Sequence, residues 1–224
     1  MLCPGSHQTE KKYQDPPKEY AAEGTFAHDI RDTALKEGLN AEDFVGTYCE
    51  VEGFGFFWGM ADAHMLQPGI DRIRDVGAEW HFEKRVNMER WIKDCWGTLD
   101  AGGILPDLII IDDLKWGRGV RVSANRNIQM MLYALGFWDQ VARHKTKARR
   151  FLLRIDQPRI PGGTNEWYTS LDELLAFAQE AIEAAELALS ENPPFAASLE
   201  ACTFCKVGAA SECGYLDNMV LELL

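Results

Sequence analysis

Residues 109–117 read Ile-Ile-Ile-Asp-Asp-Leu-Lys-Trp-Gly, and this stretch decides the fold. Three consecutive isoleucines predict a buried strand, in which side chains alternate between two faces. Asp113 and Lys115 therefore share one face, whereas Asp112 points to the other. Two acids and a lysine at the end of a buried strand are costly unless a partner compensates their charges. We therefore expect a metal ion to bind beside Asp113 and Lys115.

An antiparallel hairpin is predicted around this strand. Residues 95–100 and 107–115 read as its two strands, joined by a loop that contains Gly102, Gly103 and Pro106. The first strand would bring the carboxylate of Asp100 alongside Asp113. Two carboxylates from neighbouring strands form a site suited to Mg²⁺ or Mn²⁺, and a nearby lysine can orient water or steady charge on a phosphoryl group.

A helix is predicted at residues 20–37, before the hairpin. Thr25 is its expected N-cap and Gly38 its stop, which places His28 in the first turn. After the hairpin we expect a long helix that starts at Ser170, with Ser170 and Glu173 forming a capping box.

The remaining segments complete an alternation of helices and strands. A short helix is expected at 125–136, and strands are expected at 45–58, 79–87 and 149–157. This order predicts an α/β fold with a mixed sheet flanked by helices.

Composition favours an ordinary soluble chain, with 46% hydrophobic and 26% charged residues. We expect a single domain over residues 1–224, with a core at about 20–160 and a C-terminal region at about 168–224. No stretch of 18 apolar residues occurs, and the opening MLCPGSHQTEKK lacks the apolar core of a signal peptide. We therefore expect a cytoplasmic protein with no membrane contact, in which six cysteines serve as thiols or metal ligands.

The net charge of −12 is unevenly distributed. Residues 115–159 hold 11 of the 23 Lys and Arg but only two of the 35 Asp and Glu, so this segment carries +9 and the rest carries −21. Such asymmetry indicates a nucleic-acid-binding face on an acidic body, and Trp116, Tyr133, Phe137 and Trp138 are candidate stacking partners for bases. A solvated basic helix and hairpin is the alternative, and many of these aromatic residues can equally belong to the core.

Four motifs together resemble the PD-(D/E)XK nuclease superfamily, in particular its RecB-type branch. In chain order they are E-G-T-F-A-H at 23–28, G-T-L-D at 97–100, I-I-I-D-D-L-K-W-G at 109–117 and Q-M-M-L-Y at 129–133. The resemblance implies a restriction-endonuclease-like core. It further resembles an uncharacterised nuclease family of phages and prophages, through C-P-G-S, D-x-K-x-G-x-G-V-x-V, Q-P-R and C-x-F-C.

The resemblance also implies roles for individual residues. His28, Asp100 and Asp113 would ligate Mg²⁺ or Mn²⁺ together with the backbone carbonyl of Leu114, and Lys115 would serve the attacking water. Gln129 and Tyr133, four residues apart on one helix face, would support the active site and contact DNA.

The cysteines near the C-terminus form a second candidate site. Cys202, Cys205 and Cys213 leave a tetrahedral or cubane site one ligand short. RecB-type nucleases with an iron-sulfur cluster, including AddB and CRISPR-associated exonucleases, carry one cysteine before the catalytic His, which implies Cys3 as the fourth ligand. We expect a 4Fe-4S cluster that ties the C-terminal region to the N-terminus, with Zn²⁺ as the alternative. Cys49 and Cys95 are expected to be core thiols.

Together these patterns predict a metal-dependent DNA exonuclease. The resemblance implies a phage-encoded enzyme that acts on single- or double-stranded ends during replication or recombination in an infected bacterium, with a single-strand annealing recombinase as a partner. Two alternatives are a non-catalytic DNA-end-binding or accessory iron-sulfur module, and an acidic protein that imitates DNA. Polarity, strand preference and oligomeric state stay open.

Overall fold

The computed structural model describes residues 3–14, 16–202, 205–209 and 213–215. The chain forms two compact units: residues 17–176 make one, and residues 1–16 together with 177–224 make the other. The expected single domain over residues 1–224 stays a prediction.

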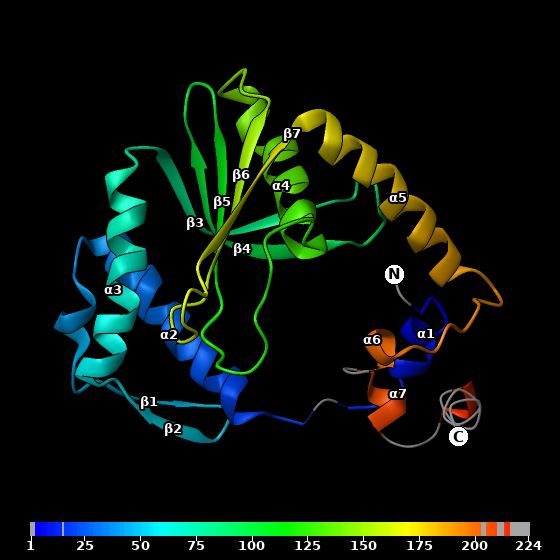
Figure 1. Cartoon of the computed structure of the whole chain (residues 1–224), viewed down its shortest axis with the longest axis horizontal. Coiled ribbons are helices and arrows are strands. Elements are labelled where there is room, and N and C mark those ends of the chain that lie inside the picture. The colour runs from blue at the N-terminus through cyan, green and yellow to red at the C-terminus, as the bar shows by residue number, and fades with distance from the viewer. Residues whose placement is uncertain (1–2, 15, 203–204, 210–212, 216–224) are drawn as a thin grey trace. The chain divides into compact units, whose positions relative to one another are not determined.

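A five-stranded mixed sheet forms the centre of the unit at residues 17–176 (Figure 1). Its strand order is β3-β4-β5-β6-β7, with β5 parallel to β6 and every other neighbouring pair antiparallel. The strands are β3 (Glu79–Asn87), β4 (Trp96–Ile104), β5 (Ile109–Leu114), β6 (Arg150–Asp156) and β7 (Asn165–Ser170). The expected α/β class with a mixed sheet flanked by helices is confirmed.

The helices of this unit lie on both faces of the sheet. They are α2 (Glu19–Glu37), α3 (Met60–Asp75), α4 (Ile128–Gln140) and two 3-10 helices, Ala41–Phe44 and Ala142–His144. A separate hairpin pairs β1 (Tyr48–Val51) with β2 (Phe54–Phe57). Helix α5 (Leu171–Leu189) starts after β7. The other unit contains the short helices α1 (Ser6–Glu10), α6 (Leu199–Cys202) and α7 (Lys206–Ala209).

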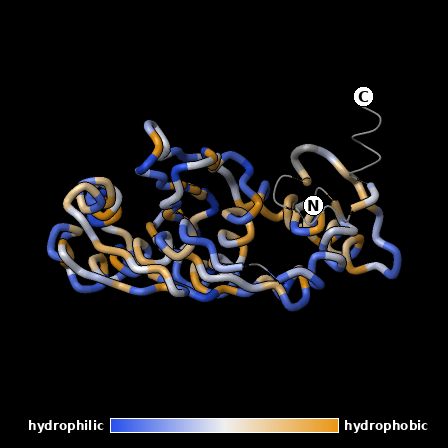
Figure 2. The backbone as a smooth tube through the Cα atoms, turned by 90° about the horizontal axis from the view of Figure 1, so that it is seen from below, coloured by the Kyte–Doolittle hydropathy of each residue, from blue (hydrophilic) through white to orange (hydrophobic). Residues whose placement is uncertain are grey.

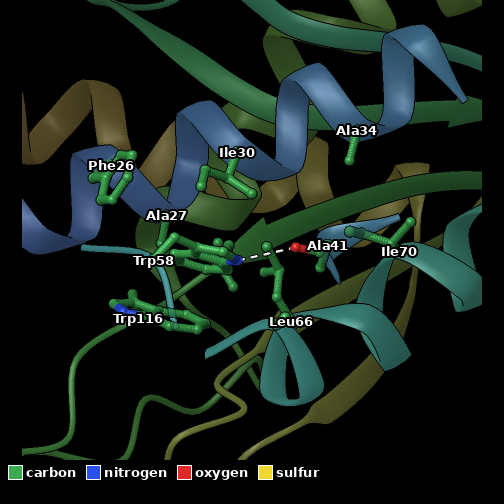
Figure 3. Packing of buried hydrophobic residues seen from close by; sticks show 11 residues of the cluster. Phe26, Ala27, Ile30, Ala34, Ala41, Trp58, Leu66, Ile70 and Trp116 are labelled. Atoms are coloured by element: carbon green, nitrogen blue, oxygen red, sulfur yellow. Dashed lines mark hydrogen bonds between the residues drawn. The ribbon is translucent and has the colours of Figure 1, made fainter. Parts of the chain in front are cut away.

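One core cluster anchors α2 and α3 to the end of β5 (Figure 3). Phe26 and Ile30 of α2 meet Leu66 of α3 there, and Leu114 of β5 belongs to the same cluster. The indole Nε1 of Trp58 donates to the carbonyl of Ala41 at 3.0 Å, so the buried ring keeps its hydrogen bond. Asp112 and Leu114 therefore face α2 and α3, whereas Asp113 and Lys115 face α4, as strand alternation predicts.

The range predicted for the first long helix agrees with α2 to within one residue, but its predicted N-cap was wrong. Helix α2 begins at Glu19, with Lys18 rather than Thr25 as its N-cap. Thr25 lies inside the helix, where its hydroxyl donates to the Ala21 carbonyl at 3.2 Å. The helix continues through Gly24 because burial of Ala22 and Phe26 outweighs the low helix propensity of glycine. The predicted stop at Gly38, which adopts φ 73°, is confirmed.

The predicted loop at the two glycines was also wrong. Strand β4 runs through Gly102 and Gly103, and Ile104 pairs with Ile109 at the end of the ladder. A Cβ on Gly102 would lie 2.7 Å from the Phe137 ring, and one on Gly103 would lie 2.9 Å from the Trp80 ring. The glycines therefore allow aromatic rings to pack closely against the strand, and they do not form a turn.

Two further elements were not predicted. Helix α3 contains Pro68, which argues against a helix in sequence reasoning, and β7 precedes the long helix without a strong strand pattern. At the start of α5 the expected N-cap is confirmed, since the Glu173 N–H donates to the Ser170 hydroxyl at 3.2 Å. The Glu173 carboxylate accepts from the Thr169 hydroxyl at 2.6 Å, which was not foreseen.

Hydrophobic and hydrophilic residues interleave along the traced chain (Figure 2). Within the described residues, no helix combines the length and apolar character that a bilayer crossing requires.

We predict that Gly102→Ala lowers the free energy of unfolding by about 1–3 kcal/mol, because the new methyl group collides with the buried Phe137 ring. Urea denaturation measures the change. Gly119→Ala is the matched control, since a Cβ there meets no atom within 4 Å, and it should change stability by less than about 0.5 kcal/mol. Equal effects of the two substitutions would contradict the packing role of Gly102.

Candidate functional site

Three elements bring the predicted catalytic residues together at the end of β5. His28 comes from α2, Asp100 from β4 and Asp113 from β5. The Nδ1 atom of His28 lies 3.1 Å from Oδ2 of Asp100. The imidazole is 28% exposed and the Asp100 carboxylate 12%, so solvent and a substrate can reach this pair.

Asp100 is the most heavily bonded member of the site. Its Oδ2 accepts the Leu114 N–H at 2.7 Å and the Arg31 Nη2–H at 3.2 Å. Burial alone would raise the pKa of Asp100, but the His28 hydrogen bond, the Arg31 charge and the Leu114 N–H together lower it. Asp100 is therefore held ionised, as a metal ligand must be.

Asp113, Lys115, Gln129 and Tyr133 form a continuous polar chain. Lys115 Nζ lies 2.7 Å from Oδ2 of Asp113 and donates to Oε1 of Gln129 at 3.1 Å. The Gln129 amide in turn donates to the Tyr133 hydroxyl at 3.1 Å. The Tyr133 ring lies against Gly97, where a Cβ would be only 2.5 Å from it. The structure thus joins the hairpin to α4 through the residues that the sequence singled out.

The Asp113 carboxylate is only 2% exposed, and its charge is poorly compensated. Burial, and then the negative charge of Asp100, raise the pKa of Asp113 to about 6, against the lowering effect of Lys115. Two carboxylates that disfavour each other's ionisation, next to an imidazole, form a donor set that fits a hard divalent cation. His28 and Asp100 are close enough to share one ion as they stand, whereas Asp113 belongs to no group of three such donors within 4.8 Å of one another among the described residues.

Asp112 lies on the opposite face, as predicted, where it pairs with two arginines. It is 1% exposed, and its two oxygens contact Arg31 at 2.9 Å and Arg154 at 3.3 Å. Sequence reasoning missed Arg31, although its position three residues after His28 places both on one helix face.

Glu83 was also missed, and it approaches the site from β3. Ligand atoms of His28, Glu83 and Asp100 lie within 4.8 Å of one another. The backbone of Glu83 has φ 45°, a left-handed conformation that costs a non-glycine residue about 1–2 kcal/mol. Nothing in the residue pattern of β3 distinguishes Glu83 from its exposed neighbours.

The basic segment at 115–159 is largely paired with acids. Seven of its cations beyond Lys115 contact carboxylates: Arg126, Arg143, Lys145, Arg149, Arg150, Arg154 and Arg159. Within the described part of the chain, Arg118, Arg121 and Lys147 have no carboxylate partner, and Arg121 donates to the Pro161 carbonyl instead. Most positive charges of this segment are therefore neutralised by carboxylates of this protein.

The aromatic residues in that segment differ in exposure. Trp116 and Phe137 are 3% and 0% exposed, so they belong to the core and are not available to bases. By contrast, Trp96 of β4 is 58% exposed, and the Arg85 guanidinium lies 4.0 Å from the centre of its ring. Asp100 follows Trp96 by four residues on the same strand.

The other unit gathers the four predicted cysteines around one pocket. Cys3, Cys202, Cys205 and Cys213 line it, together with Phe195 and Val207. The Ala196 N–H donates to the Cys3 sulfur at 3.3 Å. Burial raises the pKa of Cys205, while the N–H groups of Gly208 and Val207 act to lower it. Cys49 and Cys95 are not among the residues that line this pocket.

Comparisons with known proteins show a matching family and similar solved structures. The family model described as "Protein of unknown function (DUF2800)" matches residues 1–223. The crystal structure of "Putative exonuclease" from Eubacterium rectale is similar at 12% identity, over 95% of this chain and 82% of that chain, with a TM-score of 0.49. The crystal structure of SSO0001 is similar at 16% identity, over 67% of this chain and 68% of that chain, with a TM-score of 0.38.

We predict that the metal-free protein loses stability as pH rises from 5 to 7.5, whereas Asp113→Asn loses less. Because the pKa of Asp113 is raised from 3.8 to about 6, the folded state binds more protons than the unfolded state in that window, and ionisation above it is unfavourable. The difference between wild type and variant should be on the order of 1 kcal/mol. Urea denaturation in EDTA at both pH values measures it. If the stability of wild type and of Asp113→Asn fell equally with pH, the unfavourable ionisation of Asp113 in the folded state would be contradicted.

Proposed function

For this chain, which belongs to the DUF2800 family, we propose a metal-dependent nuclease that hydrolyses phosphodiester bonds of DNA. The observation that carries the proposal is the juxtaposition of a buried carboxylate with a lysine. Asp113 and Lys115 lie 2.7 Å apart, and the Asp100–His28 pair belongs to the same site. The agreement of this geometry with the four RecB-type motifs supports a PD-(D/E)XK site.

The donor set supports Mg²⁺ or Mn²⁺ held by His28, Asp100, Asp113 and the Leu114 carbonyl. When bound, such an ion lowers the pKa of water and neutralises charge on the phosphoryl oxygens and the leaving oxygen. Imidazole is a softer ligand than Mg²⁺ prefers, which favours Mn²⁺ at His28.

Lys115 can orient the attacking water. An ammonium group has three N–H donors, and two of them are directed at Asp113 and Gln129. The third remains for water or for a phosphate oxygen. Gln129 is a positioning residue, because it fixes Lys115 from α4 and is itself tied to Tyr133.

The surface around the site favours a nucleic-acid strand as substrate. Arg85 and the exposed ring of Trp96 lie on the ribbon of β3 and β4 that also carries Asp100, and offer one phosphate contact and one stacking surface. On the motif resemblance we extend the proposal to an exonuclease that acts on DNA ends in phage replication or recombination. It would work in the cytoplasm of an infected bacterium with a single-strand annealing recombinase.

The cysteine pocket supports a 4Fe-4S cluster as a second cofactor. Four thiolates around one Zn²⁺, at about 2.3 Å each, would bring their sulfur atoms within about 4 Å of one another. A cubane tolerates wider spacing because each thiolate binds a different iron, and the motif resemblance favours it, with Zn²⁺ on the same four thiolates as the alternative.

We predict that anaerobically purified protein degrades linear DNA, but not closed circles, with Mg²⁺ or Mn²⁺, and that EDTA abolishes this. Asp113→Ala and Lys115→Ala should each lower the rate at least about 100-fold, since they remove a metal ligand and the group that orients water. End-labelled single- and double-stranded substrates report polarity and strand preference. Lys147→Ala is the matched control for Lys115, because it removes a lysine that has no carboxylate partner in the described residues.

Cleavage of circles would replace the exonuclease with an endonuclease. Absence of any cleavage by protein that binds Mn²⁺ would overturn the nuclease and favour the accessory DNA-end-binding module.

We predict that Cys205→Ser abolishes the broad visible absorbance of a bound cluster and lowers the melting temperature by several degrees. The reason is that the cluster, which would tie Cys3 to the three C-terminal cysteines, loses a ligand. Cys95→Ser is the matched control, since Cys95 lies outside the pocket, and it should retain both iron and absorbance. Iron and zinc analysis by mass spectrometry separates the two cofactors. One equivalent of zinc without iron would select Zn²⁺.

A further inference from the structure

Glu83 contributes a carboxylate that the proposed catalytic set does not use. Its ligand atom and those of His28 and Asp100 all lie within 4.8 Å of one another, although the residues come from β3, α2 and β4. An imidazole nitrogen and two carboxylates from three elements form the donor set of a transition-metal site. Asp113 is not a member of this group.

The backbone of β3 is irregular at this residue. Phe82 pairs with Ala101 and Lys84 pairs with Leu99, so Glu83 lies at the position opposite Asp100, yet it has no partner in the ladder. With φ 45°, it departs from the extended conformation that its strand requires. The interruption therefore falls at the residue that faces the centre of the site.

The charges around Glu83 favour a cation. Asp100, Asp32 and His28 are its neighbours, and Arg31 is directed at Asp100 and Asp112. Arg31 is thus already paired, and the position holds two further carboxylates beside that of Glu83.

We propose that Glu83 is a metal ligand that binds a divalent cation together with His28 and Asp100, on the side of Asp100 away from Asp113. The inference deepens the proposed function, because Asp100 would then lie between this cation position and the one at Asp113. The site would hold two ions that share Asp100: Glu83 and His28 would bind one, and Asp113 and the Leu114 carbonyl would bind the other. Metal binding at Glu83 can be measured without any nuclease assay.

The test is a titration of metal-free protein with Mn²⁺, followed by the electron paramagnetic resonance signal of the free ion. Mn²⁺ is the probe because carboxylate and imidazole bind it, whereas the thiols of the other unit favour softer metals. Wild type should bind two ions, and Glu83→Gln should lose one or bind it at least tenfold more weakly. Glu52→Gln is the matched control: Glu52 is also an exposed glutamate with a left-handed backbone, φ 52°, but it lies at the turn of the hairpin formed by β1 and β2.

A second variant separates the carboxylate from the backbone. Glu83→Gly removes the ligand while relieving the left-handed conformation, so it should fold at least as stably as wild type in EDTA and still lose Mn²⁺. Unchanged stoichiometry and affinity in both Glu83 variants would overturn the proposal. DNA cleavage with unchanged Mn²⁺ binding in Glu83→Gln would remove this inference and keep the nuclease. Loss of Mn²⁺ in a protein that never cleaves DNA would keep the inference and remove the nuclease.

Discussion

The site depends on the two ion pairs that the buried guanidinium of Arg31 makes. It contacts Asp112 on β5 at 2.9 Å and Asp100 on β4 at 3.2 Å, and it is only 2% exposed. Its planar fork suits two carboxylates at once, so α2 is fixed against both strands of the hairpin. His28, three residues earlier on the same helix, is thereby directed at Asp100. A buried pair of this kind adds little net stability, but removal of one partner costs about 3–5 kcal/mol.

The sequence was most informative where local pattern and burial agree. The run of three isoleucines before Asp112 predicted β5, and period-two alternation assigned Asp113 and Lys115 to one face and Asp112 to the other. Gly38 as the stop of α2 and Ser170 as the N-cap of α5 followed from side-chain and backbone chemistry that acts within a few residues. Such signals do not depend on distant parts of the chain.

The rest depends on tertiary contacts that no local pattern contains. Gly102 reads as a turn residue until the Phe137 ring is known to lie against it. Helix α3 contains Pro68 in its interior. The residue pattern of β3 does not predict that Glu83 lies near His28 and Asp100. From the sequence, most cations of the basic segment likewise had no visible acidic partner, because partners such as Glu23 for Arg159 lie far away along the chain. Long-range pairing is what single-sequence reasoning cannot supply.

The cysteine pocket draws its lining from both ends of the chain, which imposes an order on biosynthesis. Cys3 leaves the ribosome first, yet Cys213 follows only after about 200 more residues, roughly 10 to 40 s later at ordinary elongation rates. The unit at residues 17–176 emerges complete in that interval and can fold before its neighbour has all its parts. Any group that binds all four thiols can therefore be completed only after Cys213 has been synthesised, when the unit at residues 17–176 has already emerged.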